Sequence, residues 1–266
     1  MGSEAAPGLF DTALRRDRLV VGAGLTAITL LAWAYIVHMG RAMSPSASMA
    51  MPMPGHLGAP ELGYLVPMWI VMMVAMMVPS AAPTILLFSS VARRRKTQGV
   101  ATASAGVFAS GYLVVWAVYA TIAAVVQWEL HRLALLSPAM VSASPWLGGG
   151  LLIVAGLYQW LPIKGACLSH CHSPFGFFAT EWREGSFGAL LMGVRHGSYC
   201  VGCCGALMAL LFVAGVMNLL WVVTIAGFVL IEKVMPRGRL VGRVAGVFFA
   251  GWGLWILVRT MDLPTF

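Results

Sequence analysis

Charged side chains are scarce in this chain of 266 residues: they make up 10% of it, and only nine residues are acidic. Soluble globular domains are about 25% charged and about 45–50% apolar, whereas 60% of this chain is hydrophobic. These values exclude a soluble globular protein and a disordered one. The apolar stretches are long and continuous, without the alternation over about ten residues that marks a transmembrane β-barrel. The composition therefore predicts an all-α, polytopic bundle of transmembrane helices.

Several motifs are also missing, and each absence argues against a class of function. The chain has no phosphate loop, dinucleotide fingerprint or serine-hydrolase motif in a usable context. It has no internal repeat of the kind that inverted-repeat transporters show, and no lysine within its last apolar stretch to hold retinal. It also lacks a basic stripe with interleaved aromatic residues, so we expect no nucleic-acid partner.

Seven apolar stretches approach the length of about 20 residues that a membrane span requires, and six spans is the alternative count. The predicted spans are 19–39, 64–90, 104–128, 147–162, 187–216, 218–232 and 244–260. We expect residues 1–266 to form a single domain embedded in the lipid bilayer. Its polar segments are a cytoplasmic tail at 1–18, a Met-rich extracytoplasmic loop at 40–63 and a Cys/His loop on the cytoplasmic side at 163–186.

The basic residues predict the orientation. Thirteen of the seventeen Lys and Arg residues fall in the N-terminal tail and in the short segments on the same side of the predicted spans, and three fall on the other side. Cytoplasmic loops carry the excess of Lys and Arg in membrane proteins. We therefore expect a cytoplasmic N-terminus, and the net charge of +8 mostly reflects this distribution. Arg195 is the one cation within a span.

The fifth predicted span carries the strongest candidate site. Its ligand candidates are spaced so that they share one helix face; they are His196, Cys200, Cys203 and Cys204. Met192 and Met208 extend this row by one step at each end and are secondary candidates. Ionisable groups within a span are costly and usually functional. One imidazole with two or three thiolates is a soft ligand set for a metal or for thiol chemistry.

A second cluster follows the fourth predicted span. It consists of Cys167, His170, Cys171 and His172, and Pro174 ends it. Cys167 and Cys171 are four residues apart and share a face if the segment is helical. This cluster is expected near the cytoplasmic face, whereas Cys200 to Cys204 are expected near the middle of the bilayer. Whether the two clusters form one site stays open.

Methionines add two further candidate groups. The second predicted span carries Met72, Met73, Met76 and Met77. Thioethers suit Cu(I), although methionine also fills gaps between packed helices. Pro79 and Pro83 are expected to kink this helix or free its carbonyls. In or near the outer loop lie the secondary candidates His38, Met49, Met51 and Met53.

Three of these motifs resemble a bacterial family of predicted metal-binding integral membrane proteins. They are Ala-Met-Met-x-Pro-Ser at 75–80, Cys-x-x-His-Cys-x-x-Pro at 167–174 and His-Gly-x-Tyr-Cys-x-Gly-Cys-Cys at 196–204. The resemblance covers about 60–260 and implies a bound metal and a place in the bacterial inner membrane. It implies neither the identity of the metal nor any reaction.

The residues favour a protein that binds Cu(I) rather than Zn²⁺ and handles, transports or delivers it to a partner, either a copper chaperone or a membrane enzyme. A membrane thiol–disulfide oxidoreductase is the first alternative, with Cys200/Cys203 or Cys167/Cys171 as the exchanging pair. A subunit or assembly factor stapled by a metal is the second. A copper enzyme ranks below these because oxygen-activating copper sites generally need several imidazoles, and only His196 lies clearly within a span.

Overall fold

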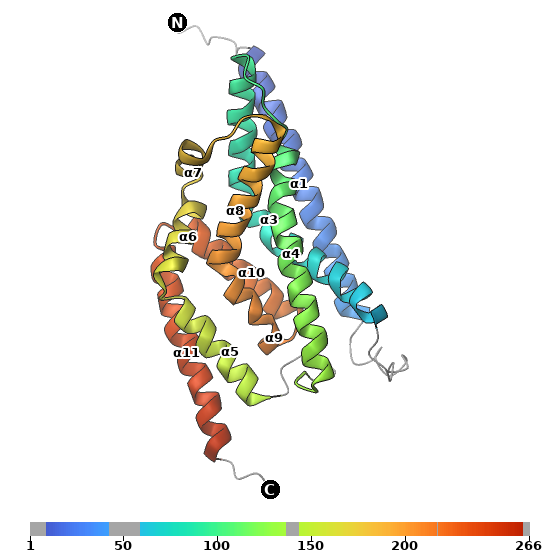
Figure 1. Cartoon of the computed structure of the whole chain (residues 1–266), viewed down its shortest axis with the longest axis vertical. Helices are drawn as coiled ribbons and strands as arrows, with labels where there is room; N and C mark the ends of the chain where they lie inside the picture. Colours follow the sequence, from blue (N-terminus) through green and yellow to red (C-terminus); the bar gives the residue numbers. More distant parts are fainter. Residues whose placement is uncertain (1–8, 43–58, 137–143, 217, 263–266) are drawn as a thin grey trace, which may run out of the picture.

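The computed structural model describes residues 9–42, 59–136, 144–216 and 218–262 (Figure 1). Every regular element in these ranges is a helix, which confirms the all-α prediction. The helices are α1 (Leu9–Ala42), α3 (Ala59–Thr97), α4 (Ala105–Arg132), α5 (Pro145–Tyr158), α6 (Pro162–His172), α7 (Pro174–Glu181), α8 (Gly185–Ala209), α9 (Leu211–Ala214), α10 (Leu219–Val234) and α11 (Gly238–Asp262).

Within the described residues, five helical segments are long and apolar enough to cross a membrane. They are Arg18–Arg41, Glu61–Thr97, Ala105–Arg132, Gly185–Ala214 and Gly238–Met261. A sixth is added if α5 and α6, which meet at 65°, form one broken span. The stretch predicted at 218–232 forms α10, whose 16 residues rise about 24 Å, less than the roughly 30 Å of a hydrocarbon core. The seventh span and the orientation stay predictions.

The segment 163–186, expected to be a loop, is largely helical. Pro162 and Pro174 stand in the first turns of α6 and α7, where a missing N–H costs nothing. Between the two helices, the Ser173 side chain accepts a hydrogen bond from the backbone N–H of Gly176 (3.2 Å). The two cysteines of this segment are thereby fixed on the regular helix α6.

The helices form two groups. In the first, α3 packs against α1 and α4, and α4 packs against α8; in the second, α5 packs against α11, and the two run side by side in Figure 1. Helix α6 leads from α5 to the face of α8, and α10 contacts α3, α6, α8 and α11. The joint between α5 and α6 therefore brings the end of the fourth predicted span back toward the middle of the molecule.

Glycines allow α4 and α8 to approach closely. A Cβ atom at Gly193 would collide with the backbone carbonyl of Phe108 and would lie 3.1 Å from the Cα of Gly111. A Cβ atom at Gly111 would likewise collide with the carbonyl of Leu190. Small residues at helix contacts in membranes permit this backbone approach. It positions the cysteine-bearing face of α8.

Helix α3 is assigned as one helix across its three internal prolines, Pro67, Pro79 and Pro83. Because Pro79 has no N–H, the carbonyl of Ala75 loses its intrahelical donor. The indole Nε1 of Trp33 in α1 donates to that carbonyl (3.1 Å). The carbonyl freed by Pro79 thus accepts a hydrogen bond that links α1 to α3.

Candidate metal-binding site

The thiols of the two sequence clusters meet between α6 and α8. All of them are free: Cys167 and Cys171 on α6, and Cys200, Cys203 and Cys204 on α8. The Sγ atoms of Cys171 and Cys203 lie 3.9 Å apart. Gly202 makes room for the second thiol of α6, because a Cβ atom there would lie 2.7 Å from Cys167 Sγ. The two clusters therefore form one group of thiols, called the sulfur cluster below.

Cys200 lies at the polar centre of the sulfur cluster. The Lys233 Nζ atom of α10 donates to Cys200 Sγ (2.8 Å) and to the Ser80 hydroxyl (3.0 Å). The Tyr112 hydroxyl lies 3.1 Å from the same sulfur. Lys233 is only 8% exposed, so a cation is buried against the thiols. Buried charges in proteins are normally paired or bound to a metal.

Sequence reasoning missed Lys233 as part of the site. Its neighbour Glu232 invites an interpretation as a simple ion pair at the end of a span. The structure instead pairs Glu232 with Lys164 of α6 (2.5 Å), and Lys233 faces the sulfur cluster. The sequence does offer the Glu232-Lys233 pair, which also matches the metal-binding family, but it does not reveal what the lysine contacts.

Helix α3 supplies a thioether to the cluster. The Cys204 thiol lies 3.8 Å from the Sδ atom of Met77. The other three candidate methionines of this helix are buried in the hydrophobic core: Met72, Met73 and Met76. The chain thus brings soft donors from three helices to one place.

The two predicted histidine ligands are held by aromatic rings. His196 is 2% exposed, and its Nδ1 atom has no hydrogen-bond partner. Its ring packs against three others at centroid distances of 5.4 to 6.1 Å: Phe108, Tyr112 and Phe177. His170 stacks on Tyr199 (4.1 Å) and its Nδ1 lies 2.9 Å from the carbonyl of Ala166. Both imidazoles therefore have structural contacts of their own.

The secondary candidates lie elsewhere. The Sδ atom of Met192 accepts a hydrogen bond from the backbone N–H of Arg183 (3.3 Å), and Met208 is buried in the core. His38 is exposed on α1. Met49, Met51 and Met53 lie outside the described residues. Arg195, the cation predicted within a span, pairs with Glu181.

The sulfur atoms of the cluster lie in close pairs. Among the described residues, no group of three or more His, Cys, Asp or Glu side chains is arranged to hold a metal ion. Metal–thiolate bonds to zinc are about 2.3 Å long, so two sulfurs bridged by such an ion lie at most about 4.6 Å apart. The Cys171–Cys203 pair at 3.9 Å and the Cys204–Met77 pair at 3.8 Å meet this limit.

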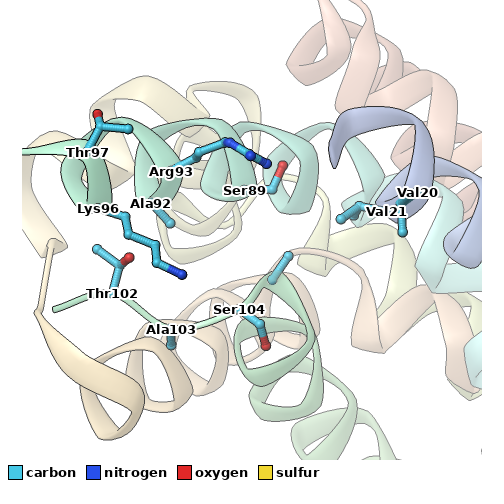
Figure 2. A pocket seen from close by; sticks show the side chains of 11 residues that line it. Val20, Val21, Ser89, Ala92, Arg93, Lys96, Thr97, Thr102, Ala103 and Ser104 are labelled. Atoms are coloured by element: carbon cyan, nitrogen blue, oxygen red, sulfur yellow. The ribbon is translucent and has the colours of Figure 1, made fainter. Parts of the chain in front are cut away.

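A hollow also lies away from the sulfur cluster. It has a volume of about 670 Å³ and is formed by α1, the end of α3 and the start of α4. Figure 2 shows the Lys96 side chain extending into it, with Thr102 and Ser104 nearby. Among the described residues, its lining consists of small, apolar, hydroxyl and basic side chains.

The comparison with protein families decides the class of this chain. Residues 66–256 match the PpoB2 family, which is described as a copper chaperone family. The chain belongs to this copper chaperone family. The match includes all five cysteines, Met77 and Lys233, whereas His38 and the Met-rich segment 40–63 precede it. No curated protein and no solved structure matches the chain.

Membership of the copper chaperone family supports the expectation of a copper-related role. The helices that are long and apolar enough to span a membrane support a multi-pass membrane protein.

Proposed function

We propose that the chain carries Cu(I) as cargo in the sulfur cluster and delivers it to a partner protein. The observation that carries this proposal is the approach of Cys171 Sγ to Cys203 Sγ, 3.9 Å apart on separate helices. Two thiolates facing each other at this distance can bridge one ion. Because they belong to α6 and α8, a small movement of α6 would change the coordination and release the ion.

The donor set favours Cu(I) over Zn²⁺. Structural zinc is almost always held by four ligands in a tetrahedral arrangement, whereas thiolates and thioethers select Cu(I). Met77 supplies a neutral thioether 3.8 Å from Cys204, a ligand that suits Cu(I). The sulfur atoms meet in pairs rather than in a set of four, which also favours Cu(I) over Zn²⁺.

The Lys233 ammonium completes the charge balance. Two thiolates and one Cu(I) ion sum to a charge of −1, which is costly to bury in an apolar interior. Lys233 lies 2.8 Å from Cys200 and adds one positive charge at the cluster. The site with its cargo is then close to neutral, and we propose Lys233 as a positioning residue for the anionic copper complex.

The sulfur atoms also form a path between helices. Cys171 of α6 faces Cys203 of α8, and Cys204, the next residue, faces Met77 of α3. Exchange from one pair to the next would move Cu(I) across the bundle without exposing the bare ion to lipid. With the N-terminus in the cytoplasm of a bacterial inner membrane, as the basic residues predict, α6 would receive or release the ion on the cytoplasmic side. The partner would be a second copper carrier or a membrane enzyme that needs copper.

Loss of either bridging thiol should strongly weaken copper binding. We expect Cys171→Ser and Cys203→Ser each to reduce bound copper well below one ion per chain, because the bridging pair loses a thiolate and the Cys204–Met77 pair has only one charged donor. Elemental analysis of the detergent-purified protein after reconstitution with Cu(I) measures this. Met192→Leu is the matched control, because it removes a buried sulfur of α8 that bonds to Arg183 instead. Unchanged stoichiometry in both cysteine variants would contradict the proposal.

Thiol–disulfide exchange is the second candidate function, and the same contact favours it. The pairs expected from the sequence lie within single helices, but Cys171 and Cys203 approach each other between two helices. A disulfide needs its sulfurs about 2.05 Å apart, so α6 and α8 would have to move closer. Mass spectrometry after alkylation distinguishes the two functions: a stable 171–203 disulfide in the purified protein favours exchange, and five free thiols favour copper binding.

A further inference from the structure

We infer that the chain binds one phospholipid where α5, α6, α10 and α11 meet, with the lipid phosphate in a polar cavity and an acyl chain in the adjoining groove. The cavity has a volume of about 270 Å³ and lies between the α5–α6 joint, the end of α10 and the start of α11. This site is separate from the sulfur cluster and does not depend on the proposed copper function.

The cavity has the charge and donors to hold a phosphate. Lys164 lines it and is 2% exposed, but Glu232 balances its charge (2.5 Å). Arg239 and Arg243 add two positive charges at the exposed mouth. Each guanidinium carries five N–H donors. Arg239 donates from Nη2 to the carbonyl of Gly165 (3.1 Å), which leaves further donors for a ligand.

A buried donor without a partner also lines this cavity. Gln159 is 6% exposed, and its Nε2 atom has no hydrogen-bond partner. Its Oε1 atom accepts from Lys164, which fixes the orientation of the amide. Leaving a buried donor unsatisfied is costly. A small rotation of this side chain toward the cavity would let a ligand oxygen satisfy it, and the two arginines are suited to a phosphate group.

An apolar groove begins where the polar cavity ends. The groove has a volume of about 420 Å³ and runs between α5 and α11, where it is lined by Leu157, Val247, Ala250, Gly251 and Leu254 among others. Trp160 lines both the groove and the polar cavity, and the guanidinium of Arg243 lies 5.7 Å from the Trp160 ring centroid. A phosphate site continuous with an apolar groove between membrane helices matches a phospholipid rather than a free phosphate ion. Basic pockets between membrane helices bind lipid headgroups in this way.

Native mass spectrometry of the full chain with added phosphatidylglycerol tests this inference. We expect one lipid to be retained by the unmodified protein. The double variant Arg239→Gln/Arg243→Gln should bind it at least about tenfold more weakly, as expected for the loss of charge-assisted hydrogen bonds. Gly251→Leu should also weaken it, because a Cβ atom at Gly251 meets nothing within 4 Å and the added side chain would fill the groove.

Two control variants match these changes. Arg259→Gln removes an arginine whose guanidinium lies 5.4 Å from the centroid of Trp255, near the other end of α11 and outside the cavity lining. Gly150→Leu adds a side chain to α5 at a position that is also open. Both should retain the lipid, and copper stoichiometry should stay unchanged in all four variants. Equal lipid retention in every variant would overturn the inference. So would binding of inorganic phosphate that depends on the two arginines while Gly251→Leu has no effect on the lipid.

Discussion

Replacing Lys233 with leucine should weaken Cu(I) binding by about 100-fold or more. The buried Lys233 ammonium lies 2.8 Å from Cys200 Sγ, and leucine removes its charge without adding a sulfur donor. Two unit charges about 4 Å apart interact by about 4 kcal/mol at an effective dielectric constant of about 20. Each 1.4 kcal/mol corresponds to about tenfold in affinity. An anionic copper–thiolate complex would therefore lose much of its stabilisation.

Competition with a Cu(I) chelator of known affinity measures this effect. Lys233→Arg keeps the charge and should retain much more of the affinity than Lys233→Leu. Lys96→Leu removes a charge from the exposed end of α3 and should leave copper binding unchanged. Equal affinity in Lys233→Leu and in the unmodified protein would show that the complex does not need this charge, and would contradict the charge-balanced site.

Adding a single methyl group at Gly193 should strongly destabilise the fold. In Gly193→Ala, the new Cβ atom would collide with the backbone carbonyl of Phe108, and Gly111 Cα would lie 3.1 Å away. Backbone atoms cannot rotate aside as side chains do, so α4 and α8 must separate. Overpacking of a core costs about 1–3 kcal/mol, and we expect a value of about 3 kcal/mol here. Copper binding should fall as well, because α8 carries three of the cysteines.

Thermal unfolding in detergent, followed by circular dichroism, measures the loss of stability. Gly227→Ala is the matched control, because a Cβ atom at Gly227 of α10 meets nothing within 4 Å. That variant should be as stable as the unmodified protein or slightly more stable, since alanine favours helix over glycine. A melting temperature in Gly193→Ala equal to that of the control would contradict the close contact between α4 and α8.

Long apolar stretches were predictable from the sequence because composition alone identifies them. The spans at 19–39, 64–90 and 104–128 lie within α1, α3 and α4, allowing for a residue at one boundary. The segment at 163–186 was harder to predict, because its helices are short and α7 begins at Pro174, a residue that also suits a loop. Pro162 indicates a helix start at this point, but local sequence does not give the 65° angle between α5 and α6.

The same bend explains why the meeting of the two cysteine clusters was not predictable. Counting residues along straight spans places Cys167 and Cys171 near a membrane face and Cys200 near the middle of the bilayer. With α6 turned onto α8, Cys171 reaches Cys203 instead. The contribution of Lys233 was hidden for a related reason, since α10 brings it to Cys200 from 33 residues further along the chain.

The candidate histidines show what residue spacing along a helix cannot predict. His196 lies on α8 with the cysteines, as its spacing predicts, but Phe108 and Phe177 come from other helices and pack around its ring. The sequence pattern identified a shared face and could not indicate which of its members contact sulfur and which contact aromatic rings.

X-ray absorption at the copper K-edge of the reconstituted protein shows directly which atoms surround the copper. We expect Cu(I) with two or three sulfur neighbours, and loss of this signal in Cys171→Ser and Cys203→Ser. Copper surrounded mainly by nitrogen or oxygen, or a sulfur shell that both variants retain, would contradict the assignment of the sulfur cluster as the copper site.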